Sequence, residues 1–480
     1  MPLGPAIGST STQPRSLHLI RLFGHYVSKT YLLLGLLEFL ICFYSLILGF
    51  YVRFQFDESQ MPKAAGALWI TATLYALVMS LSLMATGLYQ RGLSLTAGFL
   101  VRVGLSFLFA SMAMSMLFYA FPDLFLWRGV MAIAMAASLF GILLLRAVYF
   151  RMVGPEATHH RVLVLGSGRQ ARMIYDLRGA EDRFTAVGFV RMDPEENDVP
   201  AECRIDLDQP LLSYIVQHDV DELVVAPDDR RRRLPMQDIL DCKMSGIRVM
   251  DLLSFFEKEA SRVNIDILHP SWIFFSSGFQ LGGIGQYAKR LLDIVGALLI
   301  LILGAPVMLL VAGAILFECS GRGPVFFHQT RVGLNGRPFR LHKFRSMRTD
   351  AEADGVARWA SKNDTRVTRV GAVLRKLRLD EMPQAFNILR GEMSLVGPRP
   401  ERPEFVEQLA ADIPFYDERH RVKPGLTGWA QLRYPYGATL EDARMKLQYD
   451  LYYVKNASVF LDLVILLETV EVVLWGKGAR

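Results

Sequence analysis

The sequence predicts a chain of three parts: a membrane α-helical bundle of four spans, a Rossmann-like α/β domain, and a monotopic α/β domain that begins with a re-entrant, proline-bent membrane helix. Hydrophobic residues make up 52% of the 480 positions, and the mean hydropathy is +0.26. Four apolar stretches crowd the first 150 residues, and strand-like and helical stretches alternate after them. A chain of this length forms more than one hydrophobic core, so two or three domains are expected.

The four apolar stretches are each near the roughly 20 residues that cross a bilayer. They cover residues 31–51, 68–88, 96–120 and 128–150, within a predicted membrane domain over 31–150. Arg102 interrupts the third stretch near one end, and we expect its side chain to reach the membrane interface. Lysine and arginine gather before the first span and after the fourth, which predicts a cytoplasmic segment over 1–30 and both chain ends in the cytoplasm.

Charge and cysteine content exclude some classes of protein. The net charge is only +6, and no basic stripe is interleaved with aromatic residues on a recognisable module, so no nucleic-acid partner is expected. The four cysteines are scattered without a C-x-x-C pair, which argues against a disulfide framework and a thiolate metal site. They are Cys42, Cys203, Cys242 and Cys319.

A Rossmann-like domain is expected over residues 157–270. Its first strand leads into Gly166-Ser167-Gly168, a glycine turn that opens a helix and matches G-x-G-x-x-A. The turn either brings a phosphate to the helix N-terminus or closes a purely structural domain, and both interpretations stay open. Arg230–Arg233 are expected to form a solvated loop. Further strands are predicted over Ala186–Val190, Glu222–Ala226 and Ile247–Met250.

The fifth apolar segment, Ile294–Phe317, is predicted to enter and leave the same side of the membrane. As a straight helix it would be ~36 Å long, enough for a crossing. However, Gly304-Ala305-Pro306 lies near its middle, where proline removes a backbone hydrogen bond and bends the helix. Basic residues also flank both ends, whereas a span should be asymmetric. We therefore expect a re-entrant helix over about 290–318, opening a catalytic domain over 284–480.

A further apolar helix is expected near the C-terminus, over Leu461–Trp475. It carries three acidic residues, Asp462, Glu468 and Glu471. An interfacial or docked helix fits this pattern better than another crossing.

Two adjacent carboxylates, Asp380 and Glu381, are the strongest candidates for chemistry. Basic residues surround them, which is unusual for a solvated helix face but suits a nucleophile and a metal ligand that act on a phosphorylated substrate. Alternation over Phe339–Phe344 predicts a strand that presents basic side chains on one face, where arginine and lysine can clamp a diphosphate. The basic neighbours of the pair are Arg375, Lys376, Arg378, Arg390 and Arg399.

Six motifs follow one another in the second half of the chain. They are Lys289-Arg290-Leu291-Leu292-Asp293, Lys343-Phe344-Arg345-Ser346-Met347, Leu379-Asp380-Glu381-Met382-Pro383-Gln384, the segment from Gly391 to Pro400, the segment from Arg421 to Gln431, and the segment from Asp450 to Asn456. With these motifs the chain resembles the monotopic phosphoglycosyl transferases, specifically the large polyprenyl-phosphate hexose-1-phosphate transferases of bacteria. The resemblance covers essentially the whole chain. One departure is Ala305, because the family often has serine before the proline of the bend.

The resemblance implies transfer of a sugar-1-phosphate from a UDP-sugar to polyprenyl (undecaprenyl) phosphate, with release of UMP. This is the first membrane step of exopolysaccharide or O-antigen synthesis, at the bacterial inner membrane with the catalytic domain on the cytoplasmic side. Asp380 is then the nucleophile that carries the phosphosugar, and Glu381 holds Mg²⁺ beside it. Substrate binding is implied for Lys343, Arg345, Arg375, Pro398, Arg399 and Pro400. A place at the lipid phosphate and membrane interface is implied for Lys289, Arg290, Asp293 and Pro306.

Two other classes of protein stay open. One is a membrane protein that senses a nucleotide through its middle domain. The other is a nucleotide-sugar dehydratase, which is disfavoured because none of the 17 tyrosines has lysine four residues further on. The identity of the sugar is not set by these residues. The four spans and the middle domain are candidate surfaces for a homodimer.

Overall fold

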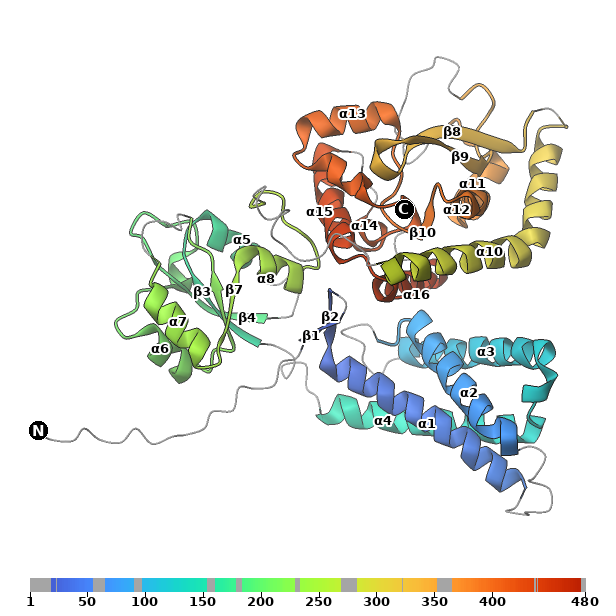
Figure 1. Ribbon diagram of the computed structural model, residues 1–480, viewed down its shortest axis with the longest axis horizontal. Coiled ribbons are helices and arrows are strands. Elements are labelled where there is room, and N and C mark those ends of the chain that lie inside the picture. Colours follow the sequence, from blue (N-terminus) through green and yellow to red (C-terminus); the bar gives the residue numbers. More distant parts are fainter. Residues whose placement is uncertain are drawn as a thin grey trace, which may run out of the picture. The chain divides into compact units, whose positions relative to one another are not determined.

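The computed structural model describes residues 19–22, 24–54, 65–89, 97–152, 160–177, 184–228, 234–268, 283–321, 323–351, 365–435, 437 and 439–475. Most of the predicted N-terminal segment over 1–30 and the arginine run Arg230–Arg233 lie outside these residues. The chain forms two compact units (Figure 1). The first consists mainly of residues 148–261, and the second mainly of residues 34–147 and 262–480.

The first unit is built on a five-stranded parallel sheet with the strand order β5-β4-β3-β6-β7. The central strand is apolar and buried from Val162 to Leu165, as expected when helices cover both faces of a parallel sheet. Leu211 and Ile215 of α6 and Cys242 of α7 pack against it. The strands are β3 (His160–Leu165), β4 (Phe184–Val190), β5 (Arg204–Ile205), β6 (Glu222–Val225) and β7 (Arg248–Asp251), and the α-helices are α5 (Arg169–Leu177), α6 (Leu211–Gln217), α7 (Met236–Met244) and α8 (Leu252–Glu259).

The predicted parallel α/β sheet is therefore confirmed in this unit. The strands β3, β4, β6 and β7 lie where the sequence predicts them. Only β5 was not expected, because a strand of two residues is too short to show alternation.

The second unit contains the apolar helices of the N-terminal half, which begin and end within a few residues of the predicted segments. They are α1 (Lys29–Arg53), α2 (Ala65–Ala85), α3 (Ala97–Ala120) and α4 (Arg128–Met152). Together with α10 (Gly283–Glu318), five described helices are long and apolar enough to cross a membrane. These helices indicate a membrane protein. Which of them cross stays a prediction.

Arg102 of α3 is buried and pairs with protein groups, and a place for it at the membrane interface stays a prediction. Its Nη1 atom lies 3.1 Å from Oε1 of Glu471 and 2.8 Å from the carbonyl oxygen of Thr86. The guanidinium group also lies over the ring of Trp475, 4.6 Å from its centroid. Glu471 and Trp475 belong to α16 (Val459–Trp475). The C-terminal helix thus docks on the apolar helices, one of the two arrangements that its acidic residues predicted.

The part of the second unit that follows α10 mixes short helices and strands. A hairpin of β8 (Phe326–Val332) and β9 (Pro338–Phe344) is antiparallel, and β10 (Ser394–Val396) pairs in parallel with β11 (Gly425–Thr427). The helices are α11 (Arg369–Lys376), the 3-10 turn η5 (Leu379–Glu381), α12 (Gln384–Arg390), α13 (Pro403–Asp412), η6 (Tyr416–Arg421), α14 (Trp429–Arg433) and α15 (Leu440–Asn456).

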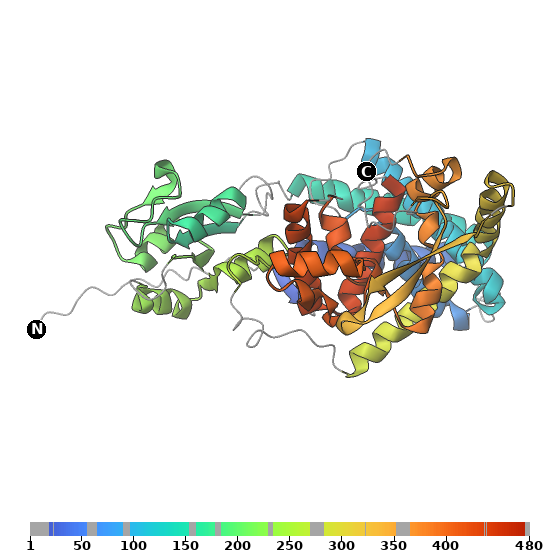
Figure 2. The same cartoon turned by 90° about the horizontal axis from the view of Figure 1, so that it is seen from above.

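Helix α10 supports these elements along its length. Its first half contacts β10, since a Cβ atom added at Gly296 would lie 2.4 Å from Leu395. Val311 and Ile315 in its second half share a core with Phe344 of β9 and Leu374 of α11. Pro306 lies inside the helix. The helix changes direction partway along in Figure 1, and the change is visible again in Figure 2. The predicted bend is therefore present, whereas re-entry into the membrane stays a prediction.

Candidate active site

The two carboxylates, Asp380 and Glu381, lie on the single turn η5 between α11 and α12. Thr368 caps the start of α11 by accepting a hydrogen bond from the backbone nitrogen of Gly371 at 2.9 Å. Arg378 has φ +57°, a left-handed conformation that turns the chain sharply after α11. Both carboxylates become largely buried at this turn, with 8% of Asp380 and 6% of Glu381 exposed.

Glu381 is fixed by three cations from three different elements. Lys343 Nζ lies 3.1 Å and Arg399 Nη2 2.9 Å from its Oε1 atom, and Arg378 Nη1 lies 3.3 Å from Oε2. Burial alone would raise the pKa of this carboxyl, but Arg399, Lys343 and Arg378 outweigh burial and hold the pKa well below its usual range. Glu381 is therefore an anion at any physiological pH.

Asp380 differs from its neighbour. Among the described residues its carboxylate has no hydrogen-bond or ion-pair partner, although Lys343, Arg375 and Arg399 are close enough to act on its charge. Burial raises the pKa of Asp380, the charge of Glu381 adds to the rise, and the three cations oppose it. One carboxylate is thus engaged in ion pairs, and the adjacent one is available to react.

The turn Pro398-Arg399-Pro400 brings a second basic group to the carboxylates. Arg399 bridges Glu381 and Gln431, with Nη1 at 3.3 Å from the Gln431 side-chain oxygen. The backbone of the turn is held on both sides, because the Pro398 oxygen accepts a hydrogen bond from Gly425 at 2.9 Å and the Pro400 oxygen accepts one from Arg331 at 3.2 Å. The structure therefore gathers Lys343 and Arg399 at Glu381, and the two prolines flank Arg399 in the chain.

The other predicted phosphate-binding residues are less close. Arg375 donates to the hydroxyl of Ser346 at 2.9 Å and acts on Asp380 through its charge. Arg345 is buried and donates to Cys319 Sγ at 2.7 Å. Its role towards substrate stays a prediction. β9 also divides its basic side chains between two faces, since Lys343 meets Glu381 while His342 contacts His328 and Arg390. The prediction that β9 presents its basic side chains on a single face is therefore wrong.

The residues predicted at the membrane interface contact protein groups. Lys289 Nζ lies 2.6 Å from Oδ2 of Asp462. Arg290 donates to two carbonyl oxygens at the end of α12, both at 2.6 Å. Asp293 accepts hydrogen bonds from the Ser394 hydroxyl and the Leu395 backbone, both at 2.8 Å. These contacts clamp the start of α10 to the carboxylate-bearing part. A role of these residues towards a lipid phosphate stays a prediction.

Sequence reasoning missed three contributors to the site. Arg378 was seen as a basic neighbour but not as a partner of Glu381, and Gln431 was seen only as the end of a motif. Arg419 also went unassigned, although it donates to the Arg399 carbonyl oxygen at 3.0 Å and pairs with Asp450 at 2.8 Å. Two of the six sequence motifs could have indicated these contacts, because Gln431 ends the segment that begins at Arg421 and Asp450 begins the last segment.

The glycine turn of the first unit is occupied by the protein's own carboxylates. Asp228 accepts hydrogen bonds from the backbone nitrogens of Arg169 and Gln170 at 2.9 and 2.8 Å, at the start of α5. Glu196 accepts one from the backbone nitrogen of Ser167 at 3.0 Å. These are the donors that would hold a phosphate at such a turn. This arrangement favours the structural interpretation of the glycine motif.

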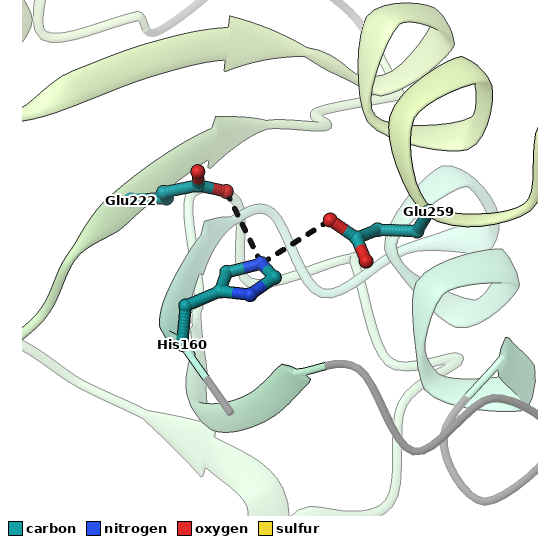
Figure 3. A group of neighbouring side chains, drawn as sticks. All are labelled: His160, Glu222 and Glu259. Carbon is teal, nitrogen blue, oxygen red and sulfur yellow. Dashed lines mark ion pairs between the residues drawn. The ribbon is translucent and has the colours of Figure 1, made fainter. Parts of the chain in front are cut away.

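One group of three candidate metal ligands occurs in the described part of the chain: His160, Glu222 and Glu259 (Figure 3). All three are buried, and His160 Nε2 lies 3.3 Å from Glu222 and 3.2 Å from Glu259. However, Lys258 Nζ lies 2.6 Å from Glu222, 2.9 Å from Glu259 and 3.1 Å from His160. The Lys258 ammonium group contacts all three side chains, so in this structure the cluster forms a buried ion network.

Comparisons with known proteins give a family and several named relatives. The model of a family described as bacterial sugar transferase matches residues 284–476. The UDP-N-acetylgalactosamine-undecaprenyl-phosphate N-acetylgalactosaminephosphotransferase of Aeromonas hydrophila is 45% identical over 244 residues, which are 50% of this chain and 55% of that protein. The UDP-glucose:undecaprenyl-phosphate glucose-1-phosphate transferase of Klebsiella pneumoniae is 39% identical over 259 residues, 54% of this chain and 53% of the relative.

The chain thus spans about half the length of these two curated relatives. A UDP-glucose:undecaprenyl-phosphate glucose-1-phosphate transferase of Caulobacter vibrioides is 45% identical over 193 residues, 40% of this chain but 71% of the relative. The apolar helices indicate a membrane protein, and its carboxylate pair lies among basic side chains. The chain belongs to the bacterial sugar transferase family.

Proposed function

We propose that the protein transfers a sugar-1-phosphate from a UDP-sugar to undecaprenyl phosphate, releasing UMP and giving undecaprenyl-diphosphate-sugar. The observation that carries this proposal is the contrast between the two carboxylates. Glu381 is held by Lys343, Arg378 and Arg399, whereas Asp380 has no hydrogen-bond or ion-pair partner among the described residues. The names of the Aeromonas and Klebsiella relatives support the same pair of substrates.

The chemistry proceeds in two displacements. A carboxylate oxygen of Asp380 forms a bond to the β-phosphorus of the UDP-sugar, while the bond between that phosphorus and the bridging oxygen breaks and UMP leaves. An oxygen of undecaprenyl phosphate then attacks the same phosphorus, and the bond to Asp380 breaks. The carboxylate is regenerated, so neither step requires a net proton. Lys343 and Arg399 stabilise the negative charge on the phosphoryl oxygens.

The donors at the site fit Mg²⁺, which proteins bind through one or two carboxylates together with substrate phosphates. Glu381 is ionised, and the oxygens of Asp380 are not engaged by described residues. Both carboxylates would hold the ion together with the diphosphate. When bound, Mg²⁺ neutralises phosphate charge and polarises the bridging oxygen.

The proposed location is the bacterial inner membrane, with four spans and the catalytic part on the cytoplasmic side. Contact between Gly304 and Met382 supports a re-entrant α10, because it sets the bend of this helix next to the carboxylate pair. At such a bend a soluble UDP-sugar and a lipid phosphate can reach the same aspartate. The process served is exopolysaccharide or O-antigen synthesis.

The experiment that tests this function uses purified protein, undecaprenyl phosphate, Mg²⁺ and a panel of UDP-sugars carrying a label in the β-phosphate. We expect labelled lipid and free UMP with at least one sugar. Release of UDP would instead indicate an ordinary glycosyltransferase. Absence of turnover with every sugar, together with nucleotide binding by the first unit, would support the sensor alternative, which the carboxylates at the glycine turn disfavour.

A further inference from the structure

The carbonyl oxygen of Val396, the last residue of β10, is held by two side chains from distant parts of the chain. Lys289 Nζ of α10 donates to it at 3.2 Å, and the Tyr453 hydroxyl of α15, which also lies 2.7 Å from Asp462 Oδ1, is 3.0 Å from it. A strand of three residues that pairs with β11 alone has little rigidity of its own. These side chains therefore support the edge of β10 that faces α10.

The ammonium group of Lys289 has all three of its donor positions engaged. Besides Val396, it lies 2.6 Å from Asp462 Oδ2 and 3.0 Å from the Tyr453 hydroxyl. An ammonium has three donors and no acceptor. Asp462 is almost fully buried, so the ion pair between Lys289 and Asp462 is shielded from water. The free energy of such a buried pair depends strongly on its geometry. No donor of Lys289 is left for a lipid phosphate.

The backbone that leaves Val396 leads within three residues to Arg399, whose guanidinium group lies 2.9 Å from Glu381. Gly397 donates its N–H to the Thr427 oxygen at 2.9 Å, and the Arg399 oxygen accepts from Arg419 at 3.0 Å. Lys289 and Tyr453 hold Val396, two residues before the turn Pro398-Arg399-Pro400. Arg419 holds the backbone of Arg399 within the turn. A shift of Val396 would therefore move the backbone of Arg399, whose guanidinium group contacts Glu381 and Gln431.

We propose that Lys289 is a positioning residue: through the Val396 carbonyl it sets the turn that carries Arg399, and it couples the place of the bent helix α10 to the UDP-sugar side of the site. This inference rests on the proposed function and deepens it. It also differs from the role at the lipid phosphate that the sequence predicts for Lys289. A displacement of about 1 Å at a catalytic group can reduce the rate about 100-fold.

The first test compares Lys289→Met with Lys289→Arg in the full chain. For Lys289→Met we expect kcat/KM for the UDP-sugar to fall about 10- to 100-fold, while KM for undecaprenyl phosphate stays within about twofold. Lys289→Arg keeps the charge beside Asp462 and should recover most of the loss. Tyr287→Ser is the matched control, because Tyr287 lies two residues before Lys289 on the same helix and is 81% exposed. A rise in KM for undecaprenyl phosphate with unchanged UDP-sugar kinetics would overturn the proposal.

Loss of Lys289 leaves Asp462 buried without its cation, so Lys289→Met can fail to fold. The double variant Lys289→Met/Asp462→Leu removes both charges and still removes the hydrogen bond to Val396. We expect it to fold and to show the same selective loss on the UDP-sugar side. A folded double variant with normal kinetics would show that Lys289 does not position the turn.

Hydrogen exchange supplies a readout that does not depend on turnover. Amides over 394–400 should exchange about tenfold faster in the double variant than in the natural chain, and at the natural rate in Tyr287→Ser. Unchanged exchange there would reject positioning by Lys289 even if the protein were inactive with every UDP-sugar. Inactivity of the natural chain, by contrast, would reject the proposed function and leave the exchange result to decide the positioning role.

Discussion

Gly304 of α10 lies directly against Met382, the residue that follows Glu381. A Cβ atom added at Gly304 would stand 2.3 Å from Met382 Cε, so only glycine allows this approach without movement of the methionine. Pro306, two residues further along, lies inside the same helix. The bend of the apolar helix and the turn with the two carboxylates therefore form one packed structure.

The first prediction follows from this contact. Gly304→Val should push Met382 and the turn η5 away from α10 and lower kcat by about tenfold or more, because the rate depends on placement of the carboxylates. Gly304→Ala should have a much smaller effect, since the methionine methyl group can rotate aside. Gly313→Val is the control on the same helix, because a Cβ there would meet nothing within 4 Å among the described residues. Equal activity of Gly304→Val and Gly313→Val would contradict the prediction.

The second prediction concerns the nucleophile. Asp380→Asn should abolish formation of labelled lipid and release of UMP, because an amide oxygen does not form the acyl phosphate. The variant should unfold at the temperature of the natural protein, since Asp380 makes no hydrogen bond or ion pair to described residues. Turnover by Asp380→Asn above a few per cent would assign the nucleophile to another group. Intact-mass measurement after addition of UDP-sugar alone should show the phosphosugar adduct only in the natural chain.

The third prediction separates Glu381 from Asp380. Glu381→Gln leaves three cations without their shared anion and removes one ligand proposed for Mg²⁺. We expect turnover to fall by about 100-fold or more and the Mg²⁺ concentration for half-maximal activity to rise. Chelation of Mg²⁺ should stop the natural enzyme, and re-addition should restore it. If the variant lost activity with an unchanged Mg²⁺ requirement, the ion would have to be held without Glu381.

The fourth prediction compares two arginines that share one partner. Arg399 bridges Glu381 and Gln431, whereas Arg378 reaches only Glu381 and its side chain is 50% exposed. Lysine keeps the charge but not the fork of donors, so Arg399→Lys should raise KM for the UDP-sugar about tenfold. Arg378→Lys should change it by less than about threefold. Equal effects of the two substitutions would show that charge alone matters at this position.

The fifth prediction concerns the ion network of the first unit (Figure 3). Burial lowers the pKa of His160, but Glu222 and Glu259 outweigh burial and raise it above its usual value. Burial would raise the pKa of Glu259, but His160 and Lys258 lower it to about 2. The stabilisation from charged His160 is complete below a pH of ~6.5 and is lost as pH rises through the raised pKa. That from Glu259 is present above a pH of ~4.3 and is lost as pH falls towards 2.

The first unit should therefore be most stable between a pH of roughly 4.5 and 6.5 and lose stability on the alkaline side. The measurement is the free energy of opening for amides over 160–259, from hydrogen exchange corrected for its intrinsic dependence on pH. His160→Gln should remove the alkaline decline and lower the maximum. A decline of unchanged size in this variant would place the responsible proton elsewhere.

Local patterns predicted the elements, and they failed where partners lie far apart in sequence. The apolar helices, four strands of the parallel sheet and the carboxylate pair with Lys343 and Arg399 follow from hydropathy, alternation and motifs. The partner of Lys289 is 173 residues away, and no local pattern shows that a basic residue before an apolar helix will meet Asp462 and not a headgroup. The place of Asp380 on the single turn η5 likewise depends on Arg378, whose backbone adopts a left-handed conformation that is rare for arginine.

The pairing of Arg102 with Glu471 also sets an order of assembly during synthesis. These residues are 369 positions apart. At about 5–20 residues per second, a ribosome needs roughly 20–70 s to make the chain between them. Arg102 is therefore made well before the carboxylate that pairs with it. A chain that stopped before Glu471 would hold every residue of the proposed site but would lack the anion that pairs with Arg102 among its apolar helices.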